Sequence, residues 1–174
     1  QLSPEQARLY DHFFLEAMVQ RQKGQNDAAF DLLNHCLDIN PHAAEVYYYL
    51  AQYYSALKQT EKALDYFQTA ARLNPQNETY METLAQVYIR QQNFQDAIAV
   101  VEKLYERHKD REDLLETLFH LYQEVDDYQS AVSVLDRIET IDGKSERLSL
   151  AKSEVYTRMG NERAAVAEMA DLAR

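Results

Sequence analysis

Glycine, proline, cysteine and tryptophan are all scarce in this sequence. Its 174 residues include three glycines, three prolines, one cysteine and no tryptophan. A sandwich or barrel of many short strands needs more turn-forming residues than this. A disordered chain is excluded as well, because 46% of the residues are hydrophobic. The composition therefore favours an all-helical protein.

The single cysteine and the lack of long apolar runs exclude further classes. Cys36 alone can form neither an intramolecular disulfide nor a cysteine-based zinc site. No apolar run approaches the roughly 20 residues of a membrane-spanning helix, and no signal segment opens the chain. We therefore expect a soluble protein without direct membrane insertion. Its compartment stays open between the cytoplasm and export after removal of an N-terminal signal, because the sequence starts at Gln1.

Acidic residues outnumber basic ones, 29 to 18, and the formal net charge is −11. A chain with this balance repels phosphate backbones and anionic lipid surfaces. We therefore expect no nucleic-acid partner.

Two residue types recur with a period of 34, which is typical of helical repeats. The tyrosines of this pattern are Tyr54, Tyr88, Tyr122 and Tyr156, and the alanines are Ala29, Ala63, Ala97, Ala131 and Ala165. Within one repeat, apolar residues at i, i+3, i+4 and i+7 mark one face of a helix rather than a strand; they are Tyr47, Leu50, Ala51 and Tyr54. A second helix follows with Ala63, Phe67 and Ala70 on one stripe. Each repeat is therefore predicted to be a helical hairpin.

Capping and turn residues agree with these helices. Ser3, followed by Pro4 and Gln6, is typical of a capped helix start. Gly24 and Gly160 fall in the turn between the two helices of the first and fifth repeats.

The second repeat resembles a tetratricopeptide repeat. Its matching residues are Tyr47, Leu50, Ala51, Tyr54, Ala63, Phe67, Ala70 and Pro75. The resemblance implies an all-α, right-handed superhelical solenoid of antiparallel helix pairs. One array would cover residues 1–174, with repeats at about 10–43, 44–77, 78–111, 112–145 and 146–174. We expect a fragment of a longer array, or an array whose end another chain covers, because the last helix would expose an apolar stripe of Val166, Met169 and Leu172.

The repeat columns also predict which residues form the core. A small residue where two helices cross lets them approach closely, which explains the alanines. Cys36 shares a column with Ala70, and we expect it to be buried and inert. Tyr47 and Tyr54 belong to core columns, whereas Tyr48 and Tyr49 fall off that face.

Catalytic patterns are missing from the sequence. The five histidines have no partner at metal-ligand spacing, and neither a glycine-rich phosphate loop nor a serine elbow occurs. We therefore expect no enzyme, no catalytic residues, no metal and no cofactor.

The resemblance places binding residues on the concave side, which the first helices of the repeats line. The candidate groove residues are Phe14, Met18, Arg21, Glu45, Tyr48, Gln52, Glu82, Gln86, Arg90, Asp113, Glu116, His120 and Glu124. The Lys, Arg and Asn clamp with which some family members hold a chaperone's terminal carboxylate is missing at these positions. The groove instead begins apolar and aromatic and becomes acidic. Its expected ligand is a protein or peptide with an apolar anchor and basic residues.

Two functions follow from these expectations. The first is a non-catalytic protein–protein interaction module, a scaffold or adaptor that binds a peptide or helix in the concave groove. The alternative is a structural or self-assembling spacer, a homo-oligomer that stacks through its exposed C-terminal helix.

Overall fold

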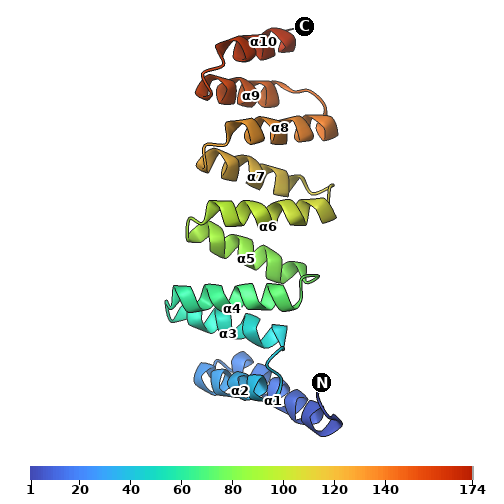
Figure 1. The fold of residues 1–174 in the computed structure, drawn as a ribbon, viewed down its shortest axis with the longest axis vertical. Coiled ribbons are helices and arrows are strands. Elements are labelled where there is room, and N and C mark those ends of the chain that lie inside the picture. The colour runs from blue at the N-terminus through green and yellow to red at the C-terminus, as the bar shows by residue number, and fades with distance from the viewer. Residues whose placement is uncertain (174) are drawn as a thin grey trace. The chain divides into compact units, whose positions relative to one another are not determined.

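Helices make up most of the protein in the computed structural model, which describes residues 1–173 (Figure 1). They are α1 (Pro4–Gln22), α2 (Asn26–Ile39), α3 (Ala44–Ala56), α4 (Thr60–Leu73), α5 (Glu78–Arg90), α6 (Phe94–Arg107), α7 (Glu112–Glu124), α8 (Tyr128–Asp142), α9 (Glu146–Arg158) and α10 (Glu162–Leu172). The described residues contain no strand. The predicted all-α fold of helical repeats is confirmed.

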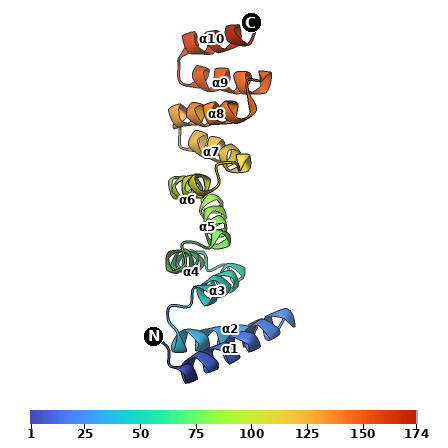
Figure 2. The ribbon, with the colours of Figure 1, turned by 90° about the vertical axis from the view of Figure 1, so that its right-hand side faces the viewer.

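The chain forms two compact units, Gln1–Leu84 and Ala85–Arg174, which divide within α5. In the first unit α1 packs on α2, α2 contacts α3, and α3 packs on α4. In the second unit the helices from α6 to α10 each contact the next one in chain order (Figure 2). Packing between sequence neighbours is the arrangement that a helical repeat requires.

The helix starts follow the capping signals of the sequence. The Ser3 hydroxyl accepts a hydrogen bond from the Gln6 backbone N–H at 3.1 Å, and the Gln6 side chain accepts one from the Ser3 N–H at 2.9 Å. Pro4 occupies the first helical position. This predicted capping arrangement is confirmed, and each bond satisfies a donor that the helix itself leaves unpaired.

The turn inside every repeat uses left-handed backbone at one position. Gly24 and Gly160 have φ values of +78° and +80°. The positions between them at steps of 34, Lys58, Gln92 and Asp126, have φ values of 62°, 60° and 58°. Left-handed backbone costs a residue with a side chain roughly 1–2 kcal/mol, whereas glycine adopts it freely. The three middle repeats therefore adopt the same turn although their residues at this position disfavour left-handed backbone.

The core follows the columns that the repeat predicts. The five alanines of the 34-residue pattern are all buried, and Cys36 and Tyr54 are buried with them. Tyr47 is half-buried and donates its hydroxyl proton to the Pro41 carbonyl at 2.8 Å. The alanine column is thus part of the core, and Ala131 packs there with Val155 of the next repeat.

We predict that Gly160→Ala lowers the free energy of unfolding by about 1 kcal/mol. No atom lies within 4 Å of a Cβ built at Gly160, so the cost would arise from the backbone alone. Thermal and urea unfolding followed by circular dichroism would measure it. Gln92→Ala is the matched control, because that position already carries a side chain at positive φ. An equal effect of both substitutions would contradict this explanation.

Candidate functional site

In the first unit, hydrogen bonds join each first helix of a repeat to the next one. Arg21 of α1 donates to the Gln52 side chain of α3 at 2.9 Å. The hydroxyls of Tyr48 in α3 and Thr83 in α5 lie 3.2 Å apart. Three of these four residues, Arg21, Tyr48 and Gln52, were candidates from the sequence. The structure therefore brings the candidates of α1 and α3 onto one polar and aromatic face.

Aromatic rings fill the same face. Phe14 stacks on Tyr10, with ring centroids 6.0 Å apart, and meets Tyr49 at 6.1 Å. The Arg21 guanidinium lies over the Tyr49 ring, 5.0 Å from its centroid. Phe14 and Tyr49 are half-buried and Arg21 is exposed. This arrangement places the Arg21 cation beside aromatic surface that is only partly buried.

Glu45 has a structural bond on this face. Its carboxylate accepts a hydrogen bond from the Tyr10 hydroxyl. Burial raises the pKa of Tyr10, and the bond to Glu45 raises it further. Tyr10 therefore stays a neutral donor over the physiological range, and Glu45 is partly engaged in holding α3 against α1.

The side chain of Tyr48 packs against other aromatic rings and is only partly accessible to solvent. Its ring contacts Phe67 at 5.8 Å and Tyr80 at 4.8 Å, and it packs against a buried cluster that includes Ala44 and Ala70. It is half-buried. The tyrosine-rich stretch of α3 thus serves packing between repeats as well as the surface.

The remaining first-unit candidates have plainer surroundings. Met18, Gln52 and Glu82 are half-buried. Glu82 has an interaction partner, so it is not a free carboxylate.

The candidates of the second unit are exposed, and three of the six are acidic. They are Gln86, Arg90, Asp113, Glu116, His120 and Glu124. Arg111 pairs with Asp113 at 2.7 Å, and its hydrogen bond lowers the pKa of that carboxyl. Behind them, Arg158 of α9 donates to the Gln123 side chain of α7 at 3.1 Å. The face of α7 is therefore charged at neutral pH and open to solvent.

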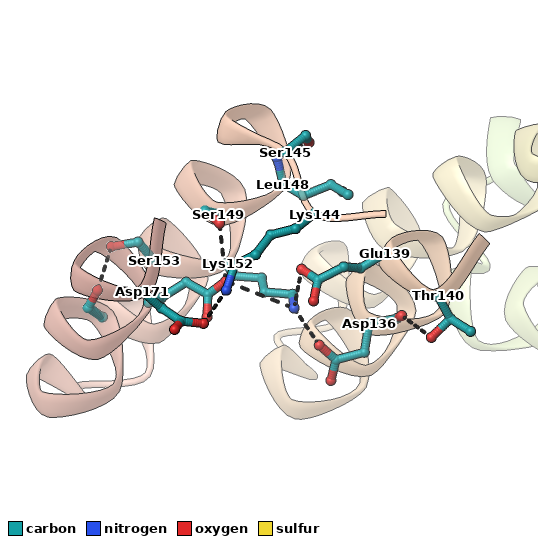
Figure 3. Close-up of polar contacts among 12 residues, drawn as sticks. Asp136, Glu139, Thr140, Lys144, Ser145, Leu148, Ser149, Lys152, Ser153 and Asp171 are labelled. Atoms are coloured by element: carbon teal, nitrogen blue, oxygen red, sulfur yellow. Dashed lines mark hydrogen bonds and ion pairs between the residues drawn. The ribbon is translucent and has the colours of Figure 1, made fainter. Parts of the chain in front are cut away.

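A buried lysine that the sequence reasoning missed joins three helices of the second unit. Lys152 of α9 is 5% exposed. Its ammonium lies 2.6 Å from Asp136 and 2.9 Å from Glu139, both in α8 (Figure 3). It lies 3.9 Å from Glu168 of α10, which also accepts a hydrogen bond from Ser149. Lys152 occupies the column that Leu50 and Leu84 fill in earlier repeats, so an ion cluster replaces an apolar contact there.

The ion cluster keeps Lys152 charged. Burial by itself disfavours the ammonium, but the hydrogen bonds to Asp136 and Glu139 outweigh it and raise the pKa of Lys152 to about 12. A lysine that acts as nucleophile or general base needs a lowered pKa. This lysine therefore has the properties of a structural cation.

A second polar cluster joins α6, α7 and α8. Arg137 donates two hydrogen bonds to the Glu102 carboxylate, at 3.1 and 3.2 Å, and the Tyr122 hydroxyl donates a third at 2.5 Å. Burial disfavours the charged carboxylate, yet the bonds from Arg137 and Tyr122 lower the pKa of Glu102. Burial and the bond to Glu102 raise the pKa of Tyr122 to about 12. A bidentate pair of this kind fixes the geometry of neighbouring repeats.

Within residues 1–173, no three His, Cys, Asp or Glu side chains are placed to hold a metal ion. In the same part of the chain, no helix is both long and apolar enough to cross a membrane.

A family model supports the repeat assignment. The model described as tetratricopeptide repeat matches residues 20–87 and 56–118, which together exceed half of the chain. The chain belongs to the tetratricopeptide repeat family. A search of curated proteins finds no significant match.

Solved structures share the tetratricopeptide fold at low sequence identity. A structure of Naa15/Naa10 bound to HypK-THB aligns with a TM-score of 0.77 and 16% identity over 91% of this chain and 25% of that chain. YrrB, described as a TPR protein with an unusual peptide-binding site, aligns with a TM-score of 0.65 and 15% sequence identity. The alignment covers 90% of this chain and 80% of the YrrB chain. A tetratricopeptide repeat protein from Parabacteroides merdae aligns with a TM-score of 0.59 and 20% sequence identity. The alignment covers 94% of this chain and 64% of that chain. This chain thus spans about a quarter of the Naa15/Naa10 chain that it matches.

We predict that Lys152→Met lowers the free energy of unfolding by roughly 1–3 kcal/mol at neutral pH, because the half-buried carboxylates of Glu139 and Glu168 lose the ammonium that they face, whereas that of Asp136 stays exposed to water. The folded-state pKa of about 12 lies above the ordinary value of 10.5. The stabilisation is therefore complete below about pH 10.5 and is lost as the pH rises through 12. Urea unfolding of both proteins across this range would show their difference shrinking.

Lys144→Met is the matched control in the same unit. Lys144 pairs with Asp171 on the surface, where both side chains are largely exposed, so its replacement should change stability little. Equal losses from the two substitutions would show that burial of the ammonium is irrelevant.

Proposed function

We propose that this chain is a non-catalytic protein-interaction module, a scaffold or adaptor, which binds a peptide or helix on the faces of its first helices. Polar residues on these helices differ in burial according to where they lie, and this difference is the main support for the proposal. Polar side chains between neighbouring repeats, such as that of Lys152, are buried and paired. Those on the face of α7, such as Glu116 and Glu124, are exposed.

The proposed ligand combines an apolar anchor with basic residues. In the first unit, half-buried rings of Phe14 and Tyr49 offer apolar area, and such rings bury surface at low entropic cost. In the second unit, Asp113, Glu116 and Glu124 offer negative charge to lysine or arginine side chains. The peptide-binding site named for YrrB is a precedent on the same fold.

We predict that peptides selected from a random display library by this protein are enriched in aromatic or aliphatic residues together with lysine or arginine. Glu116→Lys should weaken the binding of a selected basic peptide about threefold to tenfold, by replacing an attraction with a repulsion between exposed charges. Fluorescence anisotropy at two salt concentrations would measure it, since screening should reduce the effect.

Glu106→Lys is the matched control, because it makes the same change of charge at an exposed position on the second helix α6. An equal loss from both substitutions would indicate attraction to net charge, not to the face of α7. Phe14→Ala tests the apolar part separately. Selected peptides that bind all these variants equally would refute the proposal.

A further inference from the structure

Aromatic rings form a continuous strip across the first helices of the first unit, from α1 through α3 to the start of α5. In order they are Tyr10, Phe14, Tyr49, Tyr48 and Tyr80, and successive ring centroids lie 6.0, 6.1, 5.8 and 4.8 Å apart. The two end rings are buried, and the three rings between them are half-buried. We call this set the aromatic strip. Its half-buried part lies where α1 faces α3, and therefore inside the array of repeats.

Arg21 and Gln52 place hydrogen-bond donors beside the aromatic strip. The Arg21 guanidinium lies over the Tyr49 ring and gives one of its five N–H groups to the Gln52 carbonyl oxygen at 2.9 Å. That oxygen accepts the bond, so the amide NH2 group of Gln52 is a further donor. On the same face, the Glu45 carboxylate already accepts a hydrogen bond from Tyr10. A well-matched ligand of this face therefore brings hydrogen-bond acceptors and few donors.

Proteins recognise peptides as added strands, as helices in grooves or as polyproline II helices on aromatic surfaces. An added strand needs the edge of a sheet, and residues 1–173 contain no strand. An α-helical ligand uses most of its backbone carbonyls internally, so it offers few acceptors to Arg21 and Gln52. A polyproline II helix has no internal hydrogen bonds, and proline has no N–H that would need an acceptor. Its free carbonyls therefore match the donors on this face.

We propose that the aromatic strip binds a proline-rich segment of a partner protein in the polyproline II conformation. This inference rests on the proposed peptide-binding function and names proline as the aliphatic residue of its apolar anchor. Proline rings pack on the half-buried rings of Phe14, Tyr49 and Tyr48, and the backbone carbonyls of the segment accept hydrogen bonds from Arg21 and Gln52. The charges are complementary as well, because the faces of aromatic rings are negative and the N–H donors are positive.

The dimensions of the aromatic strip suit a short segment. The centroids of Phe14, Tyr49 and Tyr48 span at most about 12 Å, which about four residues of a polyproline II helix cover. Proline fixes its own backbone angle φ, so such a segment loses little conformational entropy when it binds.

A fluorescein-labelled decamer of L-proline tests the proposal by fluorescence anisotropy, with the protein at up to about 1 mM. We expect a dissociation constant of roughly 10–300 µM. A decamer of D-proline is the matched control, because it has the same composition and forms the mirror-image helix. It should bind at least about tenfold more weakly, since its carbonyls cannot meet the same donors.

Two variants test the ring and the donors separately. Phe14→Leu keeps an apolar side chain but removes a ring, and should weaken binding of the L-proline decamer about threefold to tenfold. Arg21→Met removes the N–H donors and should cause a loss of about the same size. Tyr66→Leu is the control variant, because Tyr66 is a half-buried tyrosine of the same unit that lies on the second helix α4. It should leave binding unchanged, and circular dichroism should show the same helix content in all variants.

Three results would overturn the proposal: no binding of the L-proline decamer, equal binding of the D-proline decamer, or binding that neither Phe14→Leu nor Arg21→Met weakens. The peptides selected from the random library separate these failures from failure of the proposed function. Selected peptides that lose affinity for the Phe14→Ala protein but contain no excess of proline would support peptide binding and refute the polyproline II ligand. Selected peptides that bind every variant equally would refute both.

Discussion

The close approach of two helices at a small side chain is the constraint on which every repeat depends. The alanine column is buried from Ala29 to Ala165, and a larger side chain at the crossing would push the helices apart. The same constraint acts on the turn. A short connection that returns the chain onto its own first helix needs one left-handed residue, and Lys58, Gln92 and Asp126 adopt it without being glycine. Tertiary packing therefore overrides a local backbone preference in three of five repeats.

Polar clusters add a second level of order, between repeats rather than within them. Glu102 with Arg137, and Lys152 with its carboxylates, each cross from one hairpin to the next. An apolar contact tolerates small sliding of one helix on another, whereas a bidentate pair or a buried ammonium accepts one register. These clusters consequently fix how successive hairpins of the second unit stack, and they leave the exposed face of α7 free for other contacts.

The sequence predicted the helices, the capped start at Ser3 and the buried columns, because these depend on short-range periodicity. The predicted apolar stripe of the last helix is exposed at Val166 and Met169, whereas Leu172 is half-buried. The sequence did not predict the burial of Lys152, because the acidic partners of this lysine lie 13 to 16 residues away in the sequence, on two other helices. A search for acids near Lys152 on the flanking helices would have found them. The thirteen candidate groove residues remain a prediction, although the structure shows that Tyr48 and Glu45 also serve packing.

The hydrogen bonds between repeats have a consequence for how such a chain changes in length. The pairs Tyr48 with Thr83, Glu102 with Arg137, and Gln123 with Arg158 are each separated by 35 residues. Insertion or loss of a whole 34-residue block preserves the spacing of the pairs outside it, whereas a change by any other number misaligns the helices that follow. When an added repeat folds, its helices contact only their neighbours in chain order, so the loops that close are short and their entropic cost is small. Duplication of entire repeats is therefore the route of elongation that this architecture tolerates best.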